Sequence, residues 1–145
     1  MKVQIYNPQE NERPIEGYEL IEFDGDLNSL FARLDEICCD SEAESILAPQ
    51  ILSQCARDFP DLMEKLVSKV RSGGSAVFGG VELDAFAEAV RNNTIREMNL
   101  SEVVRRCQSM LRITLCHEMT QELFPGYICS WLVKGINYEI TVSRP

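Results

Sequence analysis

The order of strand-like and helix-like segments constrains the fold of this chain more than any other feature of its sequence. Short apolar or alternating runs, which are typical of strands, are separated by segments whose apolar residues recur at helical spacing. The predicted order is strand, strand, helix, strand, helix, strand, helix, helix and then three strands. Helices that alternate with strands favour a largely parallel sheet, because a parallel connection is long enough to hold a helix.

The strands are expected at residues 2–6, 18–23, 45–48, 75–81, 111–118, 127–133 and 138–142. The helices are expected at residues 28–38, 61–71, 84–91 and 101–110. Ser72-Gly73-Gly74 is expected to end the second helix, Asp84 to cap the third, and Asn92-Asn93 to end that third helix.

The last two predicted strands flank Lys134-Gly135-Ile136-Asn137, a turn that is typical of a β-hairpin. Such a hairpin places an antiparallel pair at one edge of an otherwise parallel sheet. No linker or internal repeat divides the 145 residues, so a single α/β domain is expected.

The charge of the chain argues against nucleic acid as a partner. Fourteen basic and 23 acidic residues give a net charge of −9. Binding to phosphate backbones requires clustered Lys and Arg, and Arg105-Arg106 is the only adjacent basic pair. No apolar run approaches the roughly 18–20 residues that a membrane span needs, and the first residues are too polar for a signal peptide. A cytoplasmic protein without a membrane partner is therefore expected.

The cysteines and the single histidine do not form a recognisable metal or catalytic motif. No C-x-x-C pair occurs, and several cysteines lie in apolar segments, which favours free, reduced thiols. His117 falls in the strand expected at 111–118, where a lone histidine is usually structural or exposed. Asp24-Gly25-Asp26 is interpreted as a turn rather than as a metal site. No metal ligand and no catalytic residue is assigned. The six cysteines stand at positions 38, 39, 55, 107, 116 and 129.

Several segments together resemble the compact class I S-adenosylmethionine-dependent methyltransferases. Residues 2–7 resemble the first strand of that family, and the stretch from Gly17 to Glu22 resembles its second element, Gly-Tyr-Ile-Asn-Val-Asp. Residues 45–54 and 66–74 resemble two later segments. The resemblance implies a Rossmann-like methyltransferase fold with a mostly parallel sheet and an antiparallel C-terminal edge. It also implies that Glu22 would bind the cofactor ribose and that Asp26 would lie beside the adenine.

The sequence departs from this family at the positions that should hold the cofactor. The family's glycine-rich turn lets the backbone pass close to the cofactor. Here residues 6–12 read Tyr-Asn-Pro-Gln-Glu-Asn-Glu, without a glycine, and Pro8 lacks a backbone donor. Gln50 and Gln54 stand where the family often has histidine, and Ser53 replaces a glutamate. Glutamine cannot serve as a general base near neutral pH.

The first hypothesis is therefore a degenerate, non-catalytic methyltransferase-fold protein without a cofactor. It would act as an interaction or structural subunit with protein partners, as a homo-oligomer or in a larger assembly. Family analogy extends this hypothesis to a phage particle, in the host cytoplasm or the virion. The alternative is an active S-adenosylmethionine-dependent methyltransferase with a divergent cofactor loop, for which Glu22, Asp26 and the strand end at Gly79-Gly80 argue. A small-molecule sensor is a third reading.

Overall fold

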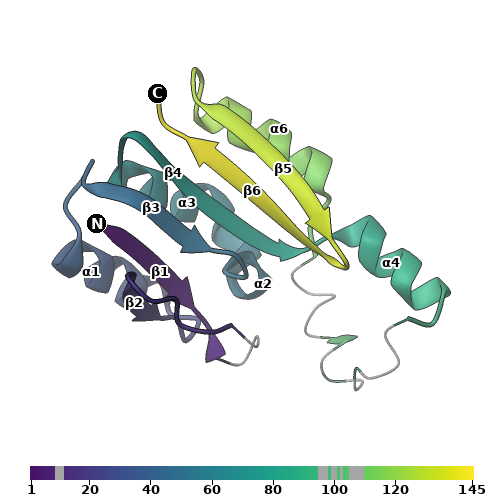
Figure 1. The fold of residues 1–145 in the computed structure, drawn as a ribbon. Helices are drawn as coiled ribbons and strands as arrows, with labels where there is room; N and C mark the ends of the chain where they lie inside the picture. Colours follow the sequence, from purple (N-terminus) through teal and green to yellow (C-terminus); the bar gives the residue numbers. More distant parts are fainter. Residues whose placement is uncertain (9–11, 95–97, 99–100, 102, 105–109) are drawn as a thin grey trace.

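A computed structural model describes residues 1–8, 12–94, 98, 101, 103–104 and 110–145. Its strands form one six-stranded sheet in the order β2-β1-β3-β4-β6-β5 (Figure 1). β1, β2, β3 and β4 are parallel, whereas β6 is antiparallel to both of its neighbours. The expected α/β fold with an antiparallel edge is confirmed. The strands are β1 (Lys2–Tyr6), β2 (Glu19–Glu22), β3 (Ala43–Ala48), β4 (Val70–Val81), β5 (Ile128–Lys134) and β6 (Asn137–Ser143).

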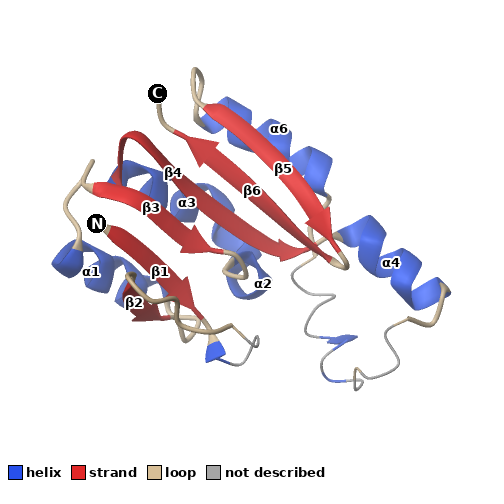
Figure 2. Ribbon diagram, in the orientation of Figure 1, coloured by secondary structure: helices blue, strands red, loops and turns tan. Residues whose placement is uncertain are grey.

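The helices other than α4 lie on one face of this sheet, and α4 lies beyond the ends of the strands (Figure 2). In Figure 2, α1, α2, α3 and α6 lie behind the strands, and the front face carries no helix in the described part of the chain. The helices are α1 (Leu27–Ile37), α2 (Leu52–Cys55), α3 (Phe59–Lys69), α4 (Leu83–Arg91) and α6 (Ile113–Leu123), with a 3₁₀ turn at Ala56–Asp58. None of these helices has the length and apolar character that crossing a lipid bilayer requires.

The handedness of the connections explains why the helices share a face. Connections between parallel strands are almost always right-handed. The connections from β2 to β3 and from β3 to β4 advance across the sheet in one direction, so their helices cover the same face. Among the connections between parallel strands, only the one from β1 to β2 runs the other way, and its described part crosses the front face as a loop.

The side chain of Gln4 binds that loop to the sheet through two hydrogen bonds. Its side-chain Nε2 donates a hydrogen bond to the Arg13 carbonyl at 2.8 Å, and its Oε1 accepts one from the Ile15 N–H at 2.7 Å. Gln4 lies on the front face of β1 and is nevertheless buried, because the loop covers it. A buried amide with both of its ends satisfied holds a loop without any helix.

The core lies between the sheet and the helix layer. Each fully buried leucine or isoleucine in it contributes about 1.5–3 kcal/mol through removal from water. Alternate residues of the strands face the helices, as the period of two in a strand requires. The buried set on the strands is Val3, Ile5, Ile21, Ile46, Ala48, Ala76, Phe78, Tyr138, Ile140 and Val142, and the helices add Leu30, Leu34, Leu62, Met63, Leu66 and Cys116.

The strand expected at 111–118 is wrong, because residues Ile113–Leu123 form α6. The short alternation of Leu111, Ile113 and Leu115 imitates a strand. The buried side chains are instead Ile113, Cys116 and Thr120, whose spacing of three and four residues is that of a helix face. His117 consequently lies on a helix and not in a strand.

The helix stop at Ser72-Gly73-Gly74 is also wrong. α3 ends at Lys69, Val70 is already extended, and both glycines lie inside β4. Their presence has a different cause: β4 shifts register against β3 between Ala43 and Ser45, and a Cβ on Gly74 would lie 2.7 Å from the Glu44 carbonyl oxygen. The glycine thus permits the irregular pairing.

The cap of α4 is Glu82 and not Asp84, which lies in the first turn of the helix. The expected end of α4 at Asn92 is confirmed. The helix expected at 101–110 lies largely outside the described residues. The hairpin turn is confirmed, with Lys134 paired to Asn137 across Gly135 and Ile136.

Candidate functional site

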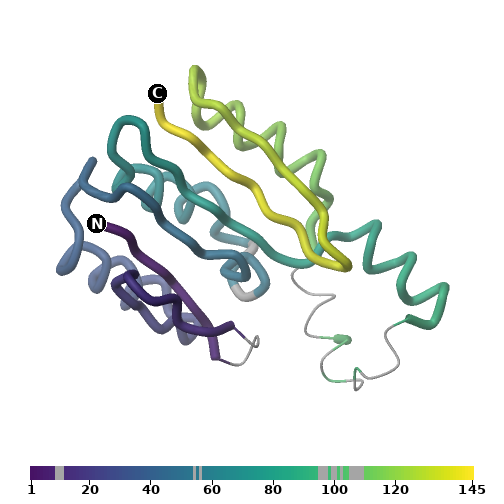
Figure 3. The backbone as a smooth tube through the Cα atoms, in the orientation of Figure 1, coloured from purple at the N-terminus to yellow at the C-terminus, as the bar shows by residue number. Residues whose placement is uncertain are grey.

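The site expected from the fold lies at the carboxyl ends of β1 and β3. The chain runs from β1 outward to β2 and then returns to β3 on the other side of β1. Ligands of open α/β sheets bind outside the carboxyl ends of the strands, at such a reversal of strand order. Both described termini, Met1 and Pro145, lie at the opposite end of the strands (Figure 3).

Protein side chains fill this crevice as far as the described residues define it. Asn7, Glu12, Phe23, Gln50 and Ile51 surround a residual space of about 170 Å³, none of which admits a water molecule. Small-molecule sites usually provide about 300–1,000 Å³. The space between these described side chains is therefore smaller than that of a typical small-molecule site.

The side chain of Glu12 accepts a hydrogen bond from the first backbone N–H group after β1, that of Asn7. The distance from its carboxylate Oε2 to the Asn7 nitrogen is 2.7 Å. In a glycine-rich turn this N–H group would be available to a ligand. Gln9, Glu10 and Asn11, which the sequence places in the same turn, lie outside the described residues.

The turn after β3 closes the crevice from the other side. Ser53 is buried, and its hydroxyl donates a hydrogen bond to the Gln50 carbonyl at 2.6 Å, so it serves the turn itself. The Gln50 Oε1 atom is buried without a hydrogen-bond partner among the described residues. An amide in this position can orient a ligand but cannot take up a proton. The side chain of Gln54 lies outside what the structure describes.

The Gly79-Gly80 strand end makes room for protein backbone. A Cβ on Gly79 would overlap the Pro49 carbonyl and lie 2.5 Å from the Tyr138 carbonyl oxygen, and a Cβ on Gly80 would lie 3.2 Å from Leu52. Both glycines therefore accommodate the β3–α2 turn and β6. Their use as a phosphate or cofactor cradle is not needed to explain them.

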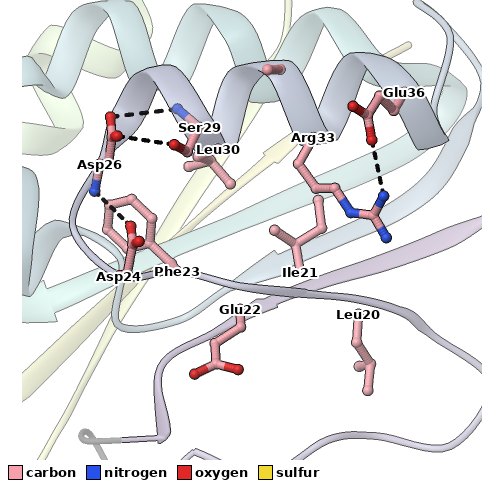
Figure 4. A pocket seen from close by; sticks show the side chains of 11 residues that line it. Leu20, Ile21, Glu22, Phe23, Asp24, Asp26, Ser29, Leu30, Arg33 and Glu36 are labelled. Atoms are coloured by element: carbon pink, nitrogen blue, oxygen red, sulfur yellow. Dashed lines mark hydrogen bonds and ion pairs between the residues drawn. The ribbon is translucent and has the colours of Figure 1, made fainter.

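Glu22 and Asp26, the residues assigned to the cofactor by resemblance, line the same groove beside α1, and their side chains point in different directions (Figure 4). Glu22 is the last residue of β2, pairs in register with Tyr6 and is exposed. In Figure 4 its carboxylate points away from α1, whereas Asp26 lies at the start of that helix.

Asp26 is the N-cap of α1. Its Oδ1 accepts hydrogen bonds from the Asn28 N–H at 3.0 Å and the Ser29 N–H at 3.4 Å, and the Ser29 hydroxyl donates to Oδ2 at 2.9 Å. The side-chain and backbone hydrogen bonds from Ser29, together with the one from Asn28, lower the pKa of Asp26 below its ordinary value. This local structural role accounts for the aspartate.

A groove of about 580 Å³ runs beside these residues, between the outer edge of β2 and α1 (Figure 4). Four carboxylates line it, those of Glu22, Asp24, Asp26 and Glu36. The lining cation is Arg33, which forms an ion pair with Glu36 at 2.9 Å. The groove is therefore unsuited to an anionic group.

The described residues do not include a cluster of three or more side chains suited to a metal ion. His117 Nε2 lies 3.1 Å from the Cys129 carbonyl oxygen and so contacts β5. Burial raises the pKa of the Cys55 thiol to about 12 and that of Cys116 to about 11. Both thiols are therefore protonated and poorly nucleophilic near neutral pH.

Sequence reasoning missed Glu82, a buried carboxylate at the carboxyl end of β4. Its Oε2 accepts a hydrogen bond from the Ala85 N–H at 2.6 Å, and its Oε1 accepts one from the Ile113 N–H at 3.3 Å. One side chain thus caps α4 and contacts the first residue of α6. A glutamate between a strand and a helix was the only signal, and glutamate is not among the preferred capping residues.

Comparison with known proteins identifies the fold. No protein-family model and no curated protein matches the chain. Among solved structures, the chain is similar to an O-methyltransferase family protein from Burkholderia thailandensis, with a TM-score of 0.55 and 13% identity over 88% of this chain. It is also similar to a SAM-dependent methyltransferase from Archaeoglobus fulgidus, with a TM-score of 0.53 and 9% identity over 88% of the chain.

The fold is therefore that of the class I methyltransferases, as the resemblance in sequence implied. The chain spans 36% of the length of the Burkholderia protein and 68% of that of the Archaeoglobus protein. At these identities the likeness concerns the fold. The activity of a protein depends on its site rather than on its fold.

Proposed function

We propose that the 145 residues form a single methyltransferase-fold domain that has lost cofactor binding and catalysis and acts as an interaction or structural subunit. The observation that carries this proposal is the filled crevice. The Glu12 carboxylate accepts a hydrogen bond from the Asn7 N–H. The side chains around it leave an empty space of about 170 Å³ in the crevice. A cofactor would have to displace a charged hydrogen bond and open the turn after β3.

The chemistry of the crevice supports the same proposal. Asn7 and Gln50 are amides, which do not exchange protons near neutral pH. Glu12 adds a negative charge where the carboxylate of S-adenosylmethionine would approach. Like charges at about 4 Å repel by ~1 kcal/mol in water-like surroundings and by several times that near a protein surface.

The location and partners in this proposal are those expected from the sequence: the cytoplasm and other protein chains. The net charge of −9 disfavours nucleic acid. Assignment to a phage particle stays a prediction from family analogy.

Calorimetric titration with S-adenosylmethionine and S-adenosylhomocysteine tests the proposal. We expect the dissociation constant to be roughly 100 µM or weaker for both, because a loss of ~3 kcal/mol weakens a micromolar site about a hundredfold, and in any case to exceed roughly 10 µM. Tighter binding by the wild-type chain would overturn the proposal.

Two variants show why binding is weak. Glu12→Gln removes the charge at the crevice, and Glu16→Gln is its control at an exposed position of the same loop. If Glu12 blocks the site, only Glu12→Gln should strengthen binding. The double substitution Asn7→Gly with Gln9→Gly tests the missing glycines. Failure of both to rescue binding would place the loss beyond the first turn.

The alternative, an active methyltransferase, is favoured by one observation. The Glu22 carboxylate is exposed at the end of β2 and beside the open groove, so one side of the ribose position is accessible. If the cofactor binds there, Glu22→Gln should weaken binding roughly 10- to 100-fold, the equivalent of losing a hydrogen bond to a charged group. Glu19→Gln, at the other end of the same strand, is the matched control. Equal effects of the two substitutions would exclude this mode of binding.

A further inference from the structure

The outer edge of the sheet at β5 exposes large apolar side chains on both faces. Ile128 is 71% exposed, Trp131 46%, Leu132 45% and Val133 41%. β5 is the last strand of the sheet and lies at its outer side in Figure 1, with α6 behind it. Lys134 is the only charged residue of β5.

The opposite edge of the sheet is built differently. β2 has four residues, two of which are Glu19 and Glu22. Short strands and charged side chains protect sheet edges against pairing with other chains. β2 has both of these protections. The seven-residue β5 carries its single charge only at its end.

Alternation identifies the peptide groups of β5 that point outward. Arg144, which follows β6, exchanges backbone hydrogen bonds with Gly73 and Gly74 of β4. Alternate residues of an antiparallel strand direct their peptide groups to the same side. The even-numbered residues of β6 thus face β4, and the odd-numbered ones face β5. In register, this leaves Cys129, Trp131 and Val133 with N–H and C=O groups that point away from the sheet.

α6 covers only the first part of this edge. His117 Nε2 lies 3.1 Å from the Cys129 carbonyl oxygen, and the Gln121 Nε2 donates to the Tyr127 carbonyl at 3.4 Å. No described residue makes a corresponding contact to the outward groups of Trp131 or Val133. The unprotected stretch is therefore residues 131–133.

We propose that this stretch pairs with the same stretch of a second copy of the chain. The two strands run antiparallel about a two-fold axis at Leu132, so that Trp131 of each copy lies opposite Val133 of the other. Each such pair exchanges both of its backbone hydrogen bonds. The two sheets become one continuous sheet, with Leu132 facing its own copy on the helix-free face.

Symmetry favours a second copy as the occupant, because the outward peptide groups of residues 131 and 133 complement those of another copy about a two-fold axis. Two chains of net charge −9 repel where acidic surfaces meet, and residues 128–133 form an uncharged contact. Pairing of β5 with β2 of another copy would build an open-ended array and would bring Glu19 and Glu22 into the contact. The two-fold arrangement closes on itself and avoids both.

The contact is small. A standard interface buries about 800 Å² on each partner. The pairing proposed here buries less, so we expect a dissociation constant of roughly 1–100 µM.

This inference rests on the proposed function, an interaction subunit, and deepens it by naming one protein partner. The two remain separable, because cofactor titration reports on the crevice and the assembly state reports on β5.

The assembly state of the full chain tests the proposal. Sedimentation equilibrium and light scattering across concentrations from about 1 to 200 µM, which span that range of dissociation constants, should show a shift from monomer to dimer. Trp131 is the only tryptophan, so its emission should move to shorter wavelength over the same range as the ring leaves water. A chain that stays monomeric throughout overturns the proposal, whether or not another protein binds the edge.

Two pairs of variants test the location and the register. Leu132→Lys places like charges on the two-fold axis and should abolish the dimer. Leu20→Lys makes the same change at a 38% exposed leucine of β2 and should leave the dimer intact. Opposite residues on the axis have Cα atoms about 4.5 Å apart, which suits a disulfide. Leu132→Cys should therefore crosslink under a mild oxidant, and Leu20→Cys and the wild type should not.

If Leu132→Lys fails to fold, crosslinking of Leu132→Cys still tests whether β5 forms the dimer contact. A dimer that survives a folded Leu132→Lys, or a crosslink that forms equally from Leu20→Cys, overturns the assignment to β5. A dimer that binds S-adenosylmethionine tightly contradicts the proposed function and leaves the interface standing.

Discussion

Gly79 lies where β4 passes under the turn that follows β3. Its lack of a side chain lets the Pro49 carbonyl approach, and the Tyr138 carbonyl oxygen would lie 2.5 Å from an added Cβ. Both neighbours are backbone atoms, which cannot rotate away as a flexible side chain can. This residue therefore determines how closely the wall of the crevice packs on the sheet.

Gly79→Ala is expected to lower the free energy of unfolding by about 3 kcal/mol or more, because the backbone itself must move to admit the methyl group. Ser75→Ala, in the same strand, is the control and should change stability by less than about 1 kcal/mol. Urea denaturation monitored by circular dichroism measures both. A loss below about 0.5 kcal/mol for Gly79→Ala, within the range of neutral surface changes, would contradict the close packing.

Asp26 provides a prediction about pH. Hydrogen bonds from Ser29 and Asn28 to the carboxylate lower its pKa in the folded state below the ordinary 3.8. Its contribution to stability is thus complete above about pH 3.8 and is lost as the pH falls through the lower folded-state pKa. Asp26→Asn should remove that part of the acid dependence of thermal unfolding between pH 2 and 5, a range around the carboxyl pKa. An unchanged pH profile would mean that Asp26 does not cap α1 in solution.

At the scale of elements, Glu82 links α4 to α6 at the carboxyl edge of the sheet. Its carboxylate accepts hydrogen bonds from the Ala85 and Ile113 N–H groups, and its own N–H donates to the Ile136 carbonyl at 2.8 Å. The side chain is buried, so the N–H groups that it satisfies cannot turn to water. Two helices and the hairpin turn are thereby positioned around one residue.

Glu82→Ala is expected to destabilise the fold by about 2–3 kcal/mol, because buried donors lose a charged acceptor. Glu88→Ala, on the exposed side of α4, should lie within about ±0.5 kcal/mol of the wild type. Urea denaturation again gives the difference. Equal effects of the two substitutions would show that the contact to Ile113 carries no stability.

How far the sequence predicts this fold depends on whether the signal is local. β1, α1, α3 and the 134–137 turn follow from short patterns of apolar and turn residues, and the structure confirms them. α6 was missed because its apolar face becomes visible only when Cys116 and Thr120 are known to be buried. The end of α3 and the cap of α4 were missed because contacts with distant residues accompany them: Val70 already pairs with Ala43 of β3, and the Glu82 carboxylate also accepts a hydrogen bond from the Ile113 N–H.

Prediction of the candidate site from the sequence has the same limit: local residue patterns are visible, and contacts between distant residues are not. The absence of glycine after β1 and the glutamines after β3 are visible in the sequence and indicate a changed crevice. The Glu12 carboxylate on the Asn7 N–H and the glycine contacts to the β3–α2 turn depend on the tertiary structure. The sequence therefore shows which residues stand in these turns, and the tertiary structure shows what those residues contact.

At the scale of the whole molecule, the thiols report on the compartment in which the chain folds. Every cysteine in the described residues is free, namely Cys38, Cys39, Cys55, Cys116 and Cys129. Disulfides persist mainly in oxidising compartments. Free thiols in the isolated protein would agree with the cytoplasmic location that belongs to the proposed function.

Thiol titration of protein prepared without reductant is expected to count close to six in denaturant, one for each cysteine of the chain. In the folded state the exposed Cys39 should react first. The buried Cys55 and Cys116, whose pKa values burial raises to about 12 and about 11, should react only as the protein unfolds. Raising the pH from 7 to 9 should therefore leave Cys55 and Cys116 unreactive as long as the protein stays folded. A count of two or fewer in denaturant would indicate disulfides and an oxidising compartment, and the location would have to be revised.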